Sequence, residues 1–181
     1  MKLLLIGLIL IPSLSYALSC KQAEELGEYM SMNGRGFIEK YKAHKIKIEE
    51  LKKKDPKAKI KDSELTLALD DVNQARRTAY NLPALKDLGF PPVGKNWEPF
   101  VVKMESSSLK ELRSGWQFKT ANGDVARVRL DYDPVKGGHY NVEVFKKGAS
   151  GKEPAKLAIT FNCNGKPCTG DQIKKMAKGF N

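Results

Sequence analysis

The chain has 181 residues, of which 41% are hydrophobic and 29% are charged, and its formal net charge at pH 7 is +11. This apolar fraction is sufficient for a folded core, so the composition excludes a wholly disordered protein. A positive charge of this size indicates an anionic partner such as nucleic acid, a membrane surface or an acidic polysaccharide, although excess lysine also keeps an exported protein soluble.

The first residues predict an export signal. Lys2 precedes an apolar run over residues 3–11, and residues 15–17 (Ser-Tyr-Ala) are small enough at both ends for cleavage by a signal peptidase. We therefore expect residues 1–17 to be a signal peptide and the mature chain to be secreted or periplasmic. Cys20 leaves a second interpretation open, in which a lipoprotein signal ends at this cysteine and a lipid anchors the protein to a membrane.

Residues 20–84 are expected to form a helical segment. Apolar residues recur at helical spacing in this part of the chain, and Asp55-Pro56 interrupts the pattern, because proline ends a helix. We predict three helices, at about residues 20–31, 36–54 and 63–80. Residues 85–108 combine prolines and glycines with aromatic residues, and we interpret them as a connection that packs against a neighbouring part of the chain.

From residue 114 onward the apolar spacing changes from helical to alternating, which predicts β-strands. Asn122-Gly123 is typical of a tight hairpin turn between the first two strands. Thr169 is expected to cap an amphipathic helix after the strands. The predicted fold class is therefore α+β: an N-terminal helical segment, followed over residues 109–181 by a roughly four-stranded antiparallel sheet with a C-terminal helix.

The cysteines suit an oxidising compartment. Cys163 and Cys168 are spaced for a small disulfide loop, with two reduced thiols as the alternative interpretation. Cys20 then remains unpaired. The chain has no second cysteine pair and only two histidines, so we expect neither a metal site nor a cofactor.

Strand alternation places the side chains of the predicted sheet on two faces. One face is apolar and forms a core. The other is polar and carries Gln117, Lys119, Arg127, Arg129, Asp131, His139, Asn141, Glu143, Thr160 and Asn162. A solvated sheet face is ordinarily polar too. However, a histidine that follows two glycines, beside a strand with the pattern Arg-x-Arg-x-Asp, favours a ligand-binding face.

These residue types suit the cleavage of RNA by attack of its 2'-hydroxyl on the adjacent phosphate. This reaction requires a base, an acid and cations that stabilise the charge on phosphorus. His139 is a candidate acid or base, because the ordinary pKa of histidine is near neutrality. The candidates for holding the phosphate are Arg127, Arg129 and Lys119. The candidates for orienting the histidine or binding the substrate are Asp131, Asn141, Glu143 and Thr160.

The strand and turn before His139 also resemble part of a known family. The stretch RVRLDYDPVKGGHYNVEV is similar to the ribonuclease domains at the C-termini of bacterial polymorphic toxins, of the barnase, EndoU, colicin and RelE superfamily. The matching positions are Arg129, Asp131, Pro134, Gly137, His139, Tyr140, Asn141 and Val142. The resemblance implies helices before a four-stranded antiparallel sheet, metal-independent cleavage of RNA, Tyr140 among the substrate-binding residues, and a cognate immunity protein as a partner.

Two features depart from this family. EndoU-type sites use two histidines, whereas the second histidine here, His44, lies on a lysine-rich predicted helix. Toxin domains also usually belong to large delivery proteins, whereas this one follows its own signal peptide and a helical segment.

The sequence therefore leaves two functions open. One is an exported metal-independent ribonuclease. The other is a non-catalytic exported or lipid-anchored binding protein that uses its basic surface for an anionic polymer or a protein partner. An enzyme requires His139 and Arg129 in one shared cleft, and a binding protein does not.

Overall fold

The computed structural model describes residues 18–57, 64–94, 96–102, 109, 111–148 and 154–179. Its helices are α1 (Cys20–Ser31), α2 (Gly34–Lys54), α3 (Val72–Tyr80), α4 (Pro83–Asp87) and α5 (Gly170–Lys178). Its main strands are β1 (Leu65–Ala68), β2 (Glu98–Val101), β3 (Arg113–Lys119), β4 (Val125–Asp133), β5 (Gly137–Phe145) and β6 (Ala155–Thr160). The short strands β7 (Asn162–Cys163) and β8 (Lys166–Pro167) form a separate hairpin.

The main strands form one mixed six-stranded sheet in the order β1-β6-β5-β4-β3-β2. β1 pairs with β6 in parallel, whereas every other neighbouring pair in this sheet is antiparallel. The α+β class and the helical N-terminus are confirmed, but the prediction of a roughly four-stranded antiparallel sheet was wrong. The unpredicted strands are β1 and β2, one at each edge.

Both edge strands lie in stretches whose patterns indicated other structures. Leu65, Leu69 and Val72 are spaced as on a helix, yet residues 65–68 pair with β6, and Asp71 caps a shorter helix after them. β2 lies in the predicted connection and contains a proline, which a sheet tolerates at an edge because no neighbouring strand needs its missing N–H group. The pairing of both strands is a tertiary interaction that local spacing does not reveal.

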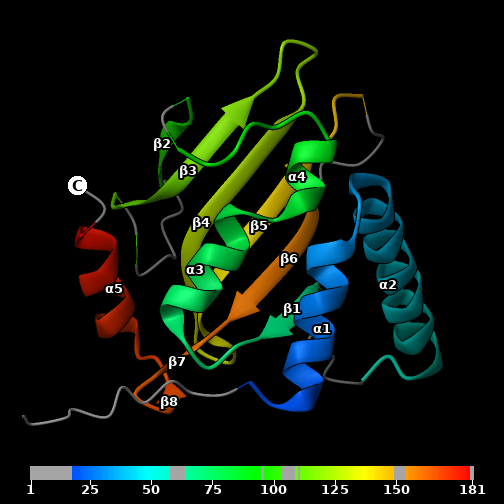
Figure 1. The fold of residues 1–181 in the computed structure, drawn as a ribbon. Helices are drawn as coiled ribbons and strands as arrows, with labels where there is room; N and C mark the ends of the chain where they lie inside the picture. The colour runs from blue at the N-terminus through cyan, green and yellow to red at the C-terminus, as the bar shows by residue number, and fades with distance from the viewer. Residues whose placement is uncertain are drawn as a thin grey trace, which may run out of the picture.

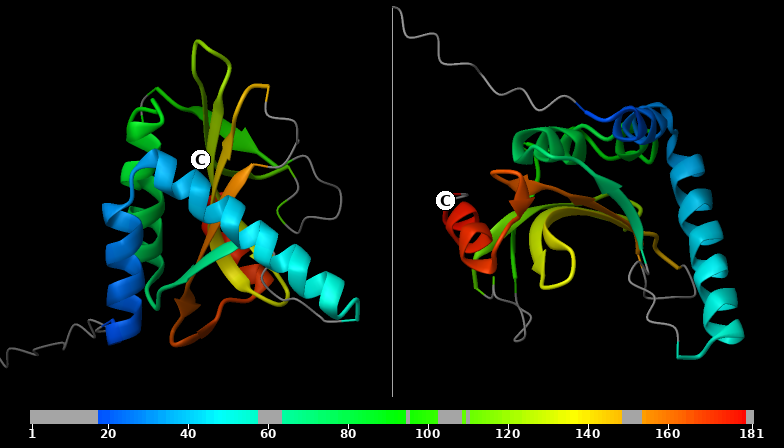
Figure 2. Two further views of the ribbon diagram at one scale, coloured as in Figure 1. Left: turned by 90° about the vertical axis from the view of Figure 1, so that its right-hand side faces the viewer. Right: turned by 90° about the horizontal axis from the view of Figure 1, so that it is seen from below.

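The helices lie mainly on one side of the sheet (Figure 1). α1, α3 and α4 lie on this face, and α5 packs beside them against β3, β4 and β5. α2 lies near the β1 edge and extends past the sheet (Figure 2). We call the opposite side of the sheet the open face. Its side chains include Gln117, Arg127, Arg129, Asp131, His139, Asn141, Glu143, Lys156 and Thr160.

The core lies between the helices and the strand residues that face them. Val128, Val142 and Leu157, on the three central strands, are fully buried. Burial of one such side chain contributes roughly 1.5–3 kcal/mol relative to its exposure. Trp97 of the connection packs against Phe118 of β3, with 5.8 Å between the ring centroids, and so extends this core toward the β2 edge.

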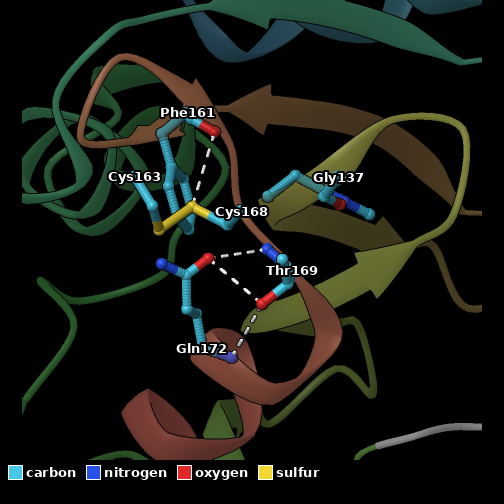
Figure 3. The surroundings of a disulfide bond; sticks show 7 residues. Gly137, Phe161, Cys163, Cys168, Thr169 and Gln172 are labelled. Atoms are coloured by element: carbon cyan, nitrogen blue, oxygen red, sulfur yellow. Dashed lines mark hydrogen bonds between the residues drawn. A yellow bond between two sulfur atoms is a disulfide. The ribbon is translucent and has the colours of Figure 1, made fainter.

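A disulfide between Cys163 and Cys168 closes the β7–β8 hairpin just before α5 (Figure 3). The Sγ atom of Cys168 lies 3.9 Å from the carbonyl oxygen of Phe161, at the end of β6. Thr169 and Gln172 then form a capping box at the start of α5. The predicted bridge is therefore confirmed, and it holds the start of α5 close to the sheet.

Replacing both bridged cysteines, C163A/C168A, is expected to lower the free energy of unfolding by about 2 kcal/mol, because the bridge restricts a short loop of the unfolded chain. Urea unfolding followed by circular dichroism measures the difference. Cys20→Ala is the matched control, since Cys20 is an exposed free thiol, and it should change the free energy by less than about 0.5 kcal/mol. Equal stability of the native and double-alanine chains would contradict the assigned role of the bridge.

Candidate functional site

β4 and β5 bring the residues singled out in the sequence together on the open face. Their register forms three neighbouring cross-strand pairs: Arg127–Glu143, Arg129–Asn141 and Asp131–His139. β6 adds Lys156 beside Glu143 and Thr160 beside His139. Directly opposed side chains in an antiparallel pair are about 5 Å apart, so these residues form one continuous polar surface.

All three guanidinium nitrogens of Arg129 donate hydrogen bonds to carboxylates. Nε and Nη2 each donate to Glu143 at 3.4 Å, and Nη1 donates to Asp131. The side chain is 11% exposed. Burial disfavours the charged form of Arg129, but Glu143 and Asp131 outweigh burial and raise its pKa. Arg129 is therefore a fixed cation whose hydrogen-bonding capacity is largely used within the protein.

Arg127 is held differently, by aromatic rings. Its guanidinium carbon lies 4.2 Å from the centroid of the Phe100 ring and 5.1 Å from that of Phe145. Nη1 donates to Glu143 at 3.4 Å, whereas the buried Nε has no hydrogen-bond partner among the described residues. Burial lowers the pKa of Arg127, against the opposing effect of Glu143, but an arginine stays charged in proteins. Its side chain is 25% exposed, so Arg127 is more accessible to a ligand than Arg129.

Arg127 and Arg129 line a pocket of about 550 Å³ between β4 and the β2 edge. The other lining residues are Pro99, Phe100, Val101, Val102 and Gln117. The pocket thus combines an apolar wall from β2 with two guanidinium groups and an amide. Ligand sites are typically apolar cavities of this size with a few placed polar groups. Such a pocket suits an anionic group attached to an apolar or aromatic body.

His139 is not among the residues that line this pocket. Its side chain is 3% exposed, and Nδ1 lies 3.0 Å from the carbonyl oxygen of Gly137. Burial lowers the pKa of His139 below its usual value, against the raising effects of the Gly137 contact, Asp131 and Glu64. The imidazole is therefore neutral at pH 7 and lies beneath other groups on the open face.

Two charged groups near His139 are Lys136, in the β4–β5 turn (Pro134–Lys136), and Glu64, and both act electrostatically on the imidazole. Lys136 Nζ forms an ion pair with Glu64, which also accepts from Lys156 Nζ at 2.7 Å. Burial raises the pKa of Glu64, but the two lysines outweigh it and lower the pKa overall. The Lys136–Glu64 ion pair therefore lies near His139, which is buried although no helix lies over the centre of this sheet face.

The remaining predicted residues take different positions. Tyr140 points to the helical face, where its ring packs against Tyr80 and Phe161, so it lies in the core. Asn141 is buried on the open face and donates to Asp131 at 3.0 Å. Lys119, at the end of β3, is exposed and does not line the pocket.

Three residues of the site were missed in the sequence. Lys156 stands at an outward position of an alternating strand, and strict application of that alternation would have found it. Phe100 and Glu64 carried no local signal, because the first lies in an unpredicted edge strand and the second was assigned to a helix. Phe100 reaches the site through the pairing of β2 with β3, and Glu64 reaches it because it immediately precedes β1.

The burial of His139 predicts a pH dependence of stability. As the pH falls, a histidine with a lowered pKa binds a proton in the unfolded chain at a higher pH than in the folded chain. Its contribution to the free energy of unfolding is therefore complete above about pH 6.5 and is lost as the pH falls below that value. The free energy of unfolding should therefore decline between pH 7 and pH 5, above the range in which carboxylates titrate. Urea titrations across this range measure the slope.

His139→Gln is the control for this prediction. It should flatten the dependence between pH 7 and pH 5, whereas His44→Gln, on α2, should retain it. A slope that is the same in the native chain and in the His139 variant would contradict the burial of a neutral imidazole.

Among the described residues, no group of three His, Cys, Asp or Glu side chains is placed to hold a metal ion. None of the helices in this part of the chain is long and apolar enough to cross a membrane. Comparison with protein-family models finds no match to the chain, and comparison with curated proteins finds none either. What the open face can bind or do is therefore inferred from its geometry.

Proposed function

We propose that the protein is an exported binding protein that holds an anionic polymer in the pocket formed by Arg127, Arg129 and the β2 edge. One observation carries this proposal: Arg127 contacts two aromatic rings while its side chain stays 25% exposed beside a 550 Å³ pocket. A preoriented arginine of this kind binds phosphate, sulfate or carboxylate groups with charge-assisted hydrogen bonds.

The position of His139 favours binding over catalysis. A general acid or base must come within hydrogen-bond reach of the reacting atoms, directly or through one water molecule. His139 is buried and does not line the pocket that contains Arg129. The shared cleft that an enzyme would require is therefore not formed in this conformation.

Three further features support an exported protein with an anionic partner. The disulfide suits a non-reducing environment. The N-terminal sequence has the pattern of a signal peptide, with Cys20 as the position for a lipid anchor in the alternative interpretation. The net charge of +11 attracts anionic polymers at long range.

A metal-independent ribonuclease is the second candidate function, and one observation favours it. The Asp131–His139 pair lies directly beside the Arg129–Asn141 pair on the same face. A histidine and an arginine would thus be adjacent if the turn moved away, in the arrangement that the resemblance to toxin ribonucleases implies.

Arg127→Ala should weaken the binding of a fluorescently labelled single-stranded RNA or of heparin by about tenfold or more, because a charge-assisted hydrogen bond contributes roughly 1.5–3 kcal/mol. Fluorescence anisotropy at several salt concentrations measures the dissociation constant and its salt dependence. Lys119→Ala is the matched control: it removes one exposed cation outside the pocket and should change the constant by less than about threefold.

The same samples separate the two candidates. RNA that stays intact in EDTA while binding depends on Arg127 supports the binding protein. Cleavage by the native chain that is lost in a folded His139→Ala variant would instead establish the ribonuclease. Equal affinity of the native chain and the Arg127 variant for both polymers would refute the assigned pocket.

A further inference from the structure

The β4–β5 turn (Pro134–Lys136) lies across the open face instead of extending beyond the end of its hairpin. Lys136 pairs with Glu64, and the strand registers place Glu64 level with Glu143, four residues along β5 from His139. Four residues of a strand span about 13 Å, so Lys136 reaches that level only because the turn folds back. The turn is the yellow loop that curls away from the helices beneath the sheet (Figure 2).

The turn has a fixed base and an exposed tip. A Cβ atom on Gly138 would lie 2.3 Å from Cδ1 of Ile173, so the base packs directly against α5. At the tip, Val135 is 72% exposed. Asp133 Oδ1 accepts the backbone N–H groups of Val135 and Lys136, at 2.7 Å and 3.0 Å, which makes the turn internally rigid. Both hydrogen bonds lie within the turn, so they do not depend on the Lys136–Glu64 contact.

A series of ion pairs connects Lys136 of the turn to the Arg127 pocket. Glu64 pairs with Lys136 and with Lys156, and Lys156 Nζ also lies 4.0 Å from Glu143. Glu143 in turn accepts from Arg127. An anion that competes with Glu143 for Arg127 therefore acts on the same set of charges that holds the turn.

We propose that the β4–β5 turn is a latch, closed by the Lys136–Glu64 ion pair, that covers His139. When the ion pair breaks, the turn moves about its glycine base and exposes the imidazole beside Arg129. The functional consequence of the latch rests on the proposed function, because the surface that it uncovers lies next to the anion-binding pocket. In the open form, a polymer that enters the pocket also reaches a titratable group.

Chemical modification of histidine tests the latch without any assay of activity. Diethyl pyrocarbonate reacts with accessible imidazoles, and mass spectrometry gives separate rates for His139 and for His44, which serves as the internal reference. In the native chain His139 should react slowly. Lys136→Met should raise its rate relative to His44 by about tenfold, the order expected for loss of a partly buried charge-assisted contact. Glu64 keeps Lys156 in this variant, so no buried carboxylate is left unpaired.

Two further variants act as controls. Lys136→Arg keeps a long cationic side chain and should restore slow modification. Lys146→Met breaks the 2.7 Å ion pair with Asp124 at the other hairpin of β4 and should leave the rate at His139 unchanged. A folded Lys136→Met protein that reacts at the native rate would overturn the proposal, as would an equal acceleration in Lys146→Met.

The outcomes for the latch and for the proposed function are separable. Anion binding that survives Arg127→Ala refutes the function and leaves the modification rates to decide the latch. Native-like modification in Lys136→Met refutes the latch and leaves the pocket untouched. RNA cleavage that appears in Lys136→Met and is absent after the further change His139→Ala would support the latch and assign the uncovered surface to a ribonuclease.

Discussion

The open face depends on one buried carboxylate, that of Glu143. A carboxylate at 5% exposure would destabilise the fold if it were unpaired, because burying a charge without partners is costly. Arg127 and Arg129 approach it from one side and Lys156 from the other. Glu143 thereby fixes the position of both arginines and, through Lys156 and Glu64, the electrostatic environment of the β4–β5 turn. The pocket and the latch are two consequences of one set of charges.

The two arginines of β4 are alike in sequence and differ in use. Arg129 donates to carboxylates from three nitrogens and contributes mainly to the structure of the site. Arg127 contacts two phenylalanine rings and stays partly exposed beside the pocket. Most charges on the open face are paired with one another. Because the two arginines differ in this way, the face can still present one cation, Arg127, to a ligand. Ligand binding is therefore assigned to one arginine, supported by the other.

The alternation of residues 113–160 predicted much of the sheet and most of the open face. Its period of two fixes which side chains share a face, so Arg127, Arg129, Asp131, His139 and Asn141 were grouped correctly. It could not place Phe100 or Glu64, because Phe100 lies in one edge strand and Glu64 immediately precedes the other, and the rest of the sheet decides how these strands pair. It also could not show that His139 is buried near the Lys136–Glu64 ion pair, since this pair joins residues 72 positions apart.

The sequence by itself determined the α+β class, the hairpin order of the central strands, the C-terminal helix and the Cys163–Cys168 bridge. All of these follow from local periodicity, turn chemistry or short spacing. Only the tertiary structure decided the two edge strands, the pocket at the β2 edge and the ion pair between the β4–β5 turn and Glu64. These features depend on contacts between distant residues. The side chains that stabilise these features come into contact only when the chain folds, so no local sequence pattern predicts them.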